Sequence, residues 1–370
     1  MSITIGIVGA GLCGRLTALH CLARGWKVSL FDADSHLGHN SCGWVGAGML
    51  APYTELESSE LLIFKLGLSA LELWPSLLKQ LCKPVAFSQH GTLLLNHPQD
   101  KGERDRLLAI IEFKLRQAHL PALNSIAEFI PNTALHNFVP GLNSNVQDGY
   151  WLRDEGHLNS HEFYKATTAT LLAHGINWHE LTPVEQLNDY QIVAQGKTHY
   201  FDLVFDCRGL GAKPDWPQLR GVRGEVLILH APEVHLNCPI RIMHPRYPIY
   251  ISPRAGNTFI VGATSIESED KSPISAQSML ELLSACYMVH PGFAEARILH
   301  TMTQCRPTLS DNQPRIIASE GLIRLNGLYR HGYLVGPALL DEAMRYLEHG
   351  KKAMHHPELV DELKENLAWL

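Results

Sequence analysis

Three glycines near the start of the chain are spaced for binding a dinucleotide. Gly9, Gly11 and Gly14 fit the pattern G-x-G-x-x-G directly after a short run rich in isoleucine and valine. In such a turn the first glycine permits a tight bend, the second lets the backbone approach a pyrophosphate, and the third lets the helix pack closely on the strand. Asp32 follows at the end of the next apolar run, where a carboxylate can bind a ribose 2′-hydroxyl and repels a 2′-phosphate. The pattern predicts a site for FAD or NAD and does not separate the two.

The elements around these glycines form a βαβ unit. Residues 3–8 form a predicted strand, residues 12–24 carry apolar positions at helical spacing, and Gly25 ends that helix. The next strand is "KVSLFDA". The helix would then point its free N–H groups and positive dipole end at the phosphates.

The tetrapeptide VGAG of this turn occurs again at residues 45–48, where no helical pattern follows. The small residues Gly46, Ala47 and Gly48, followed by Met49, would let the backbone lie flat against a planar group. Taken alone, the segment is better interpreted as a plain loop between strands.

Four segments spread along the chain resemble, in the same order, those of the D-amino-acid oxidase family, and within it the glycine oxidases most of all. They read "GAGMLAP", "YPIYISPRAGNTFIVGAT", "CRPTLSDNQPRI" and "GLYRHGYLVGPAL". The resemblance implies FAD as the cofactor, with the second VGAG beside the flavin ring. It implies further cofactor contacts at Val184, Gly209, Gly211 and Gly332.

The same resemblance implies the residues of the substrate site. Arg306 and Tyr250 occupy the positions at which the family holds a substrate carboxylate, and Arg330 the position that faces the flavin and the substrate. The neighbouring His331 is a further candidate for the site, although it could be an ordinary loop residue. The family moves a hydride from a carbon beside nitrogen to flavin N5, and the protein supplies orientation and electrostatics. A guanidinium suits this task because its planar fork matches a carboxylate. No catalytic base is nominated, because an amine that binds neutral needs none.

The expected substrate is a small amino acid or amine, and the expected electron acceptor is O₂ or another carrier. A dehydrogenase of an N-substituted amino acid, a flavoprotein that acts on a partner protein and an NAD-dependent dehydrogenase remain alternatives. Trp44 before the second VGAG, together with basic groups at His244 and Arg246 and with Tyr247, suggests a pocket larger or more charged than glycine requires. Cys305 raises the question of a flavin–cysteine bond, although a free buried cysteine is the favoured interpretation.

The composition excludes several classes of function. A net charge of -6 argues against a nucleic-acid binder, which needs a basic face. Eight cysteines without a C-x-x-C pair indicate no metal site and fit a reducing cytoplasm. The most apolar stretch, "LLIFKLGLSALELWPSLL", contains Lys65, Glu72 and Pro75, so a core helix is predicted and no integral membrane segment.

The fold class predicted is α/β plus α+β: a Rossmann-type FAD-binding domain with an inserted antiparallel-sheet substrate domain. Evenly spaced alternating segments between residues 221 and 263 indicate the antiparallel sheet. The predicted FAD-binding domain comprises residues 1–58, 140–215 and 300–370. The predicted substrate domain comprises residues 59–139 and 216–299.

Overall fold

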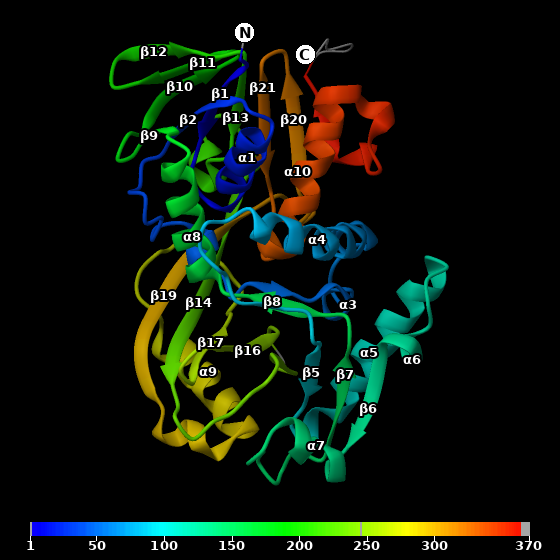
Figure 1. Cartoon of the computed structure of the whole chain (residues 1–370). Helices are drawn as coiled ribbons and strands as arrows, with labels where there is room; N and C mark the ends of the chain where they lie inside the picture. Colours follow the sequence, from blue (N-terminus) through cyan, green and yellow to red (C-terminus); the bar gives the residue numbers. More distant parts are fainter. Residues whose placement is uncertain (1, 245, 364–370) are drawn as a thin grey trace.

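The computed structural model describes residues 2–244 and 246–363, and two large sheets organise it (Figure 1). The smaller of them has seven strands in the order β22-β20-β21-β13-β1-β2-β9. Its strands are β1 (Thr4–Val8), β2 (Lys27–Phe31), β9 (Asn177–His179), β13 (Leu203–Asp206), β20 (Arg315–Ser319), β21 (Leu322–Asn326) and β22 (Val360–Glu362).

The predicted βαβ unit is confirmed at the centre of this sheet. β1 pairs in parallel with β2 on one side and with β13 on the other, and helix α1 (Leu12–Ala23) connects β1 to β2. β1 and β13 are mostly apolar and buried, as expected where helices cover a parallel sheet. Because carboxyl ends of parallel strands share one edge, the turns after β1 and β13 open side by side.

Three further helices pack against the same core. They are α4 (Leu61–Lys79), α8 (Ser160–Ala173) and α10 (Gly332–His349). Leu66 and Trp74 of α4 are buried with Leu334 and Leu339 of α10 in one hydrophobic cluster. By length and composition α4 is the helix, among those described, that could cross a membrane, and in this fold much of its apolar face is buried against α10.

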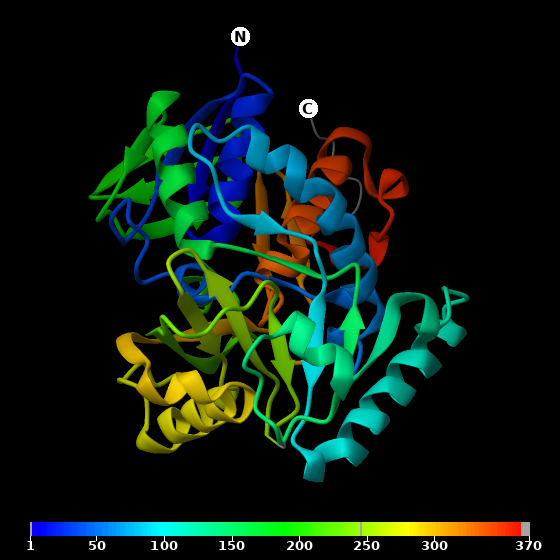
Figure 2. The ribbon, with the colours of Figure 1, turned by 60° about the horizontal axis from the view of Figure 1, so that its bottom comes forward.

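The second large sheet has nine strands and is mainly antiparallel, which confirms the predicted antiparallel sheet (Figure 2). The order is β18-β14-β17-β16-β15-β5-β7-β6, and β19 pairs with β14. Its strands are β5 (Thr92–Leu95), β6 (Ala127–Pro131), β7 (Asp148–Leu152), β14 (Arg220–His230), β15 (Ile240–Ile242), β16 (Ile249–Arg254), β17 (Thr258–Gly262), β18 (Ile266–Glu267) and β19 (Arg297–Thr308). Helices α5 (Lys101–Gln117), α7 (Asn132–Phe138) and α9 (Ala276–Val289) pack against this sheet.

Short elements join and extend the two sheets. β3 (Met49–Leu50), β8 (Gly156–Leu158) and β4 (Phe87–Ser88) form one small sheet, and β10 (Val184–Asn188), β11 (Gln191–Ala194) and β12 (Lys197–Tyr200) form another. The short helices are α2 (Cys42–Val45), α3 (Pro52–Glu55) and α6 (Leu123–Ile126).

Two elements bear on where the chain divides. β7 falls within the predicted range 140–215, and the structure pairs it with β5 and β6 of the large antiparallel sheet. α4 falls within the predicted range 59–139, and it shares its core with α10. We propose that α4 belongs to the first unit and β7 to the second, because each would expose buried surface if it were separated from its neighbours.

Candidate active site

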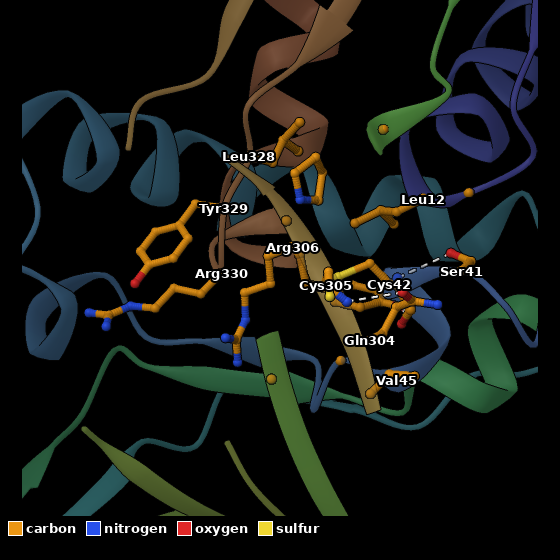
Figure 3. Close-up of a pocket in the computed structure, with 18 of the residues that line it drawn as sticks. Leu12, Ser41, Cys42, Val45, Gln304, Cys305, Arg306, Leu328, Tyr329 and Arg330 are labelled. Carbon is orange, nitrogen blue, oxygen red and sulfur yellow. Dashed lines mark hydrogen bonds between the residues drawn. The ribbon is translucent and has the colours of Figure 1, made fainter. Parts of the chain in front are cut away.

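A cavity of about 510 Å³ lies between the two large sheets. Figure 3 shows part of its lining, with Leu12 and Ser41 on one side of Cys42 and with Arg306 and Arg330 on the other. The cavity is thus shared by the glycine turn, the second VGAG and the strands of the antiparallel sheet. A concave site of this size, lined mainly by small and apolar residues with charged groups among them, is typical of ligand binding.

The glycines of the first turn have different physical reasons to be glycine. Gly9 has φ of +95°, and a Cβ on it would lie 2.5 Å from the Cys207 carbonyl oxygen. A Cβ on Gly14 would collide with the Gly9 carbonyl oxygen, so the helix packs on the turn without space for a side chain. Gly11 differs, because its nearest neighbour would be the Ser41 Oγ at 3.5 Å. Nothing in the protein crowds Gly11, so its requirement for glycine would come from a ligand.

Two residues hold this turn in place. The Asp32 carboxylate accepts hydrogen bonds from the backbone N–H groups of Ala10 and Asp34, and it lines the cavity. The buried Arg15 donates through Nε to the Ala10 carbonyl oxygen at 2.8 Å. Sequence reasoning missed Arg15, because an arginine inside a helical pattern gives no signal of its partners.

The second VGAG also lines the cavity, together with Met49. Gly48 has φ of +73°, and a Cβ on it would collide with the Leu158 carbonyl oxygen of β8. The Ala47 carbonyl oxygen accepts a hydrogen bond from Arg254 Nη2 at 2.5 Å. The residues of this segment are small because β8 leaves no space for side chains on one side. On the other side, the backbone of the segment lines the cavity.

The other predicted cofactor contacts are placed unequally. Gly209, Gly211 and Gly332 line the cavity, whereas Val184 lies in β10 outside the lining residues of the described chain. Thr182, two residues before Val184, donates its N–H to the Asp32 carbonyl oxygen at 2.7 Å. The Val184 segment therefore runs beside the end of β2, and its contact with a cofactor stays a prediction.

The residues present fit a flavin dinucleotide. Helices α1 and α10 both begin at the cavity without a side-chain cap, so their first N–H groups are available to negative charge. The uncrowded Gly11 lies at the start of α1, and the wall formed by the second VGAG offers flat backbone. In the described ranges, no group of three or more His, Cys, Asp or Glu side chains could hold a metal ion.

Arg306 brings an uncompensated positive charge into the cavity. Among the residues that the structure describes, its hydrogen-bond partner is the Arg223 carbonyl oxygen, at 3.3 Å from Nη1, and no carboxylate pairs with it. Burial lowers the pKa of the guanidinium, as expected for a cation removed from water. The remaining donors of Arg306 are free for an anionic ligand.

Arg330 is held by a carboxylate that the sequence did not reveal. Glu55 of α3 forms an ion pair with Arg330 at 2.7 Å and lies 3.3 Å from His331 Nδ1. Burial alone would raise the pKa of Glu55, but Arg330, His331 and Arg241 hold it at about 2. Burial and the neighbouring arginines lower the pKa of His331 to about 4, so the imidazole is neutral at neutral pH.

Tyr250 extends from β16 into the same group of residues. Its hydroxyl lies 3.1 Å from Thr54 Oγ1 and 3.3 Å from Glu55 Oε1, and it lines the cavity. Burial raises the pKa of this phenol, so it stays protonated and can donate a hydrogen bond. The structure therefore brings Tyr250, Arg306, Arg330 and His331 to one cavity, as the sequence resemblance implied.

The residues suspected of enlarging the pocket are turned elsewhere. Trp44 stacks on His161, with ring centroids 4.1 Å apart, and is not among the described residues that line the cavity. Arg246 and Tyr247 both bond to Glu281 of α9. The expectation that these side chains change the pocket is thus not supported by their positions.

Comparisons with known proteins agree with this geometry. The family model described as "FAD dependent oxidoreductase" (DAO) matches residues 4–341. A protein of Rhizobium etli named "Putative thiamine biosynthesis oxidoreductase ThiO" is 36% identical over 339 residues, which cover 92% of this chain and 94% of the relative.

Solved structures show the same fold at low identity. Glycine oxidase from Geobacillus kaustophilus superposes with a TM-score of 0.83 at 20% identity, covering 99% of this chain and 100% of that one. Iminodiacetate oxidase from Chelativorans sp. BNC1 gives a TM-score of 0.76 at 20% identity, covering 91% and 93%. Because the family model spans most of the chain and the Rhizobium etli relative is 36% identical over 92% of it, the chain belongs to the DAO family of FAD-dependent oxidoreductases.

Proposed function

We propose that this FAD-dependent oxidoreductase oxidises the carbon–nitrogen bond of a small amino acid that carries one free carboxylate. The observation that carries the proposal is Arg306, a guanidinium in the cavity with no carboxylate partner among the described residues. The other described arginines that line the cavity are already paired, Arg330 with Glu55 at 2.7 Å and Arg208 with Asp206 at 2.7 Å. One unpaired guanidinium matches one substrate carboxylate.

Bound FAD supplies the acceptor for a hydride. Arg306 would bind the substrate carboxylate through its fork, and Tyr250 would donate its phenolic hydrogen to the same group. Two contacts to one carboxylate fix the direction of the α-carbon, which is the contribution of orientation. Glu55 would keep Arg330 pointed along the cavity wall, and the neutral His331 would add no further charge.

A screen of the purified holoenzyme under anaerobic conditions tests this proposal. Glycine, sarcosine and D-alanine should bleach the flavin, whereas methylamine, which lacks a carboxylate, should not. Arg306→Ala should keep FAD and lose this reduction, while Arg297→Ala, an exposed arginine at the start of the same strand, should behave as wild type. Bleaching by methylamine as fast as by glycine would remove Arg306 from its role.

The electron acceptor is the second part of the proposal. An oxygen pulse after reduction separates an oxidase, which reoxidises at once, from a dehydrogenase, which needs a quinone or another carrier. A holoenzyme reduced by no free amino acid would favour a flavoprotein that acts on a partner protein.

All eight cysteines are free thiols, which supports a place in the reducing cytoplasm.

A further inference from the structure

A line of hydrogen bonds leads from Tyr250 to a carboxyl group outside the cavity. Glu155, in the turn between β7 and β8, is fully buried and is not among the described lining residues. Its Oε1 accepts from the Thr54 N–H at 2.7 Å and from Thr54 Oγ1 at 3.0 Å. Thr54 Oγ1 in turn lies 3.1 Å from the Tyr250 hydroxyl. Glu155 thus reaches the substrate side of the cavity through one threonine.

The charge state of Glu155 is not fixed by a partner. Glu55 and Glu57 each form an ion pair with an arginine, whereas no Lys, Arg or His of the described chain forms an ion pair with Glu155. Its Oε2 has no hydrogen-bond partner, and neither has Thr92 Oγ1 of β5. Burial raises the pKa of Glu155 to about 7, against the opposing effects of the hydrogen bonds from Thr54 and of the Arg241 charge.

The hydroxyl groups of Thr54 and Tyr250 carry one hydrogen each. The protonation state of Glu155 therefore decides which of the two hydroxyls donates to the other. A charged Glu155 requires the Thr54 hydroxyl hydrogen, and Thr54 Oγ1 then accepts from Tyr250. A neutral Glu155 is a weaker acceptor, so the Thr54 hydroxyl can turn to Tyr250 and donate to it. In that arrangement the phenolic hydrogen of Tyr250 is released from Thr54 and turns to the cavity side, where Glu55 Oε1 lies 3.3 Å away and a carboxylate ligand can also accept it.

We infer that Glu155 is a positioning residue for Tyr250: when neutral it frees the Tyr250 hydroxyl to donate to a carboxylate ligand, and when charged it withdraws that donor. The inference deepens the proposed function and rests on it, because it takes Tyr250 as a carboxylate donor. Affinity for a carboxylate should therefore fall as Glu155 ionises. Losing one hydrogen bond to a charged ligand corresponds to about a tenfold change in Kd.

Other titratable and charged groups lie near Tyr250 and Glu155, but they keep the same charge between pH 6 and 8.5. Arg241 of β15 has its guanidinium carbon 5.8 Å from the Tyr250 ring centroid, and Glu55 and Arg330 lie on the cavity side. The pKa of Glu55 is held at about 2 by its cationic neighbours against burial, and that of His331 is lowered to about 4, mainly by burial. Tyr53 stays protonated, because burial raises its pKa to about 12.

Acetate is a suitable probe, because it stays ionised above pH 6 and has no amine that titrates. Its Kd for the holoenzyme, measured by calorimetry between pH 6 and 8.5, should rise about tenfold in the wild type. Glu155→Gln, which is always neutral, should bind at the low-pH affinity throughout. Tyr250→Phe should bind weakly at every pH, since it has no hydroxyl to redirect.

Two further variants separate positioning from a purely structural role. Thr54→Val breaks the line while keeping the backbone N–H that Glu155 accepts, and it should abolish the pH step. Thr54→Ser restores the hydroxyl and should restore the step, which tests the inference without any change at Glu155. A Kd that is independent of pH in the wild type, or a step that persists in Tyr250→Phe, would overturn the inference alone. Acetate binding that is absent, or unchanged in Arg306→Ala, would overturn the proposed function with it.

Discussion

The guanidinium of Arg306 on β19 lies directly over Gly224 of the neighbouring strand β14. A Cβ on Gly224 would lie 2.6 Å from the Arg306 Cζ and 2.8 Å from its Nη1. β14 and β19 are paired antiparallel, with Gly224 opposite Gln304 in the register. The guanidinium of Arg306 can thus occupy this position only because Gly224 has no side chain.

Gly224→Ala should displace Arg306 without unfolding the chain, because the group it meets is the mobile end of a side chain. FAD content should be unchanged, while KM for the carboxylate substrate rises about tenfold or more, the size of a charge-assisted contact. Steady-state kinetics and the flavin-to-protein absorbance ratio check this. Gly102→Ala is the matched control, since a Cβ there meets nothing within 4 Å. Equal KM values in the two variants would show that Gly224 does not seat Arg306.

Gly11→Val and Gly14→Ala should fail in different ways. A Cβ at Gly11 meets only an ordinary contact within the protein, so Gly11→Val should fold, with native circular dichroism, and bind no FAD. A side chain at Gly14 collides with the Gly9 carbonyl oxygen, so Gly14→Ala should lose stability. Flavin content and thermal unfolding of both variants separate the two effects. Full flavin occupancy in Gly11→Val would mean that no phosphate approaches this turn.

Features that depend on a single helix, strand or short sequence motif could mostly be predicted from the sequence. The βαβ unit follows from apolar periodicity interrupted by glycines. Arg306 and Arg330 could be predicted for the site because each lies in a segment that resembles the family, and these segments follow one another in the family's order. Such signals are local, and the fold only brings their residues together. The antiparallel sheet was predicted for the same reason, since its strands alternate at even spacing.

Contacts between distant segments could not be predicted in this way. Glu55 lies in a four-residue helix after the second VGAG, and nothing in "PYTE" announces that it will bind Arg330. β7 has the pattern of a strand, but its pairing with β5 and β6 depends on where the chain returns. Trp44 suggested a bulky pocket residue, and only its stacking on His161 shows that it turns away. Partner choice is a property of the fold, which one sequence does not display.

The buried Glu155 should make stability depend on pH. Its pKa is raised by burial from 4.5 to about 7, so the folded chain holds a proton that the unfolded chain releases. The contribution of Glu155 to the free energy of unfolding is therefore fully present below pH 4.5, its pKa in the unfolded chain, and is lost as the pH rises through about 7, its pKa in the folded chain. Glu155→Gln should gain on the wild type between pH 5 and 8, by up to about 3 kcal/mol. Urea unfolding at several pH values measures this, with Glu128→Gln, an exposed glutamate paired with Arg153, as control. Parallel pH profiles for the wild type and Glu155→Gln would contradict the prediction.

The thiol of Cys305 bears on how FAD is attached. Its Sγ lies 3.6 Å from the Asp270 carbonyl oxygen and 3.7 Å from that of Ser268, so the S–H has two backbone acceptors. Burial raises the pKa of this thiol, which disfavours the thiolate that would attack a flavin. Acid precipitation of the holoenzyme should therefore release all of the FAD into the supernatant, in the wild type and in Cys305→Ser alike. Flavin that stays with the precipitated wild type and is released from Cys305→Ser would show a covalent bond at this residue.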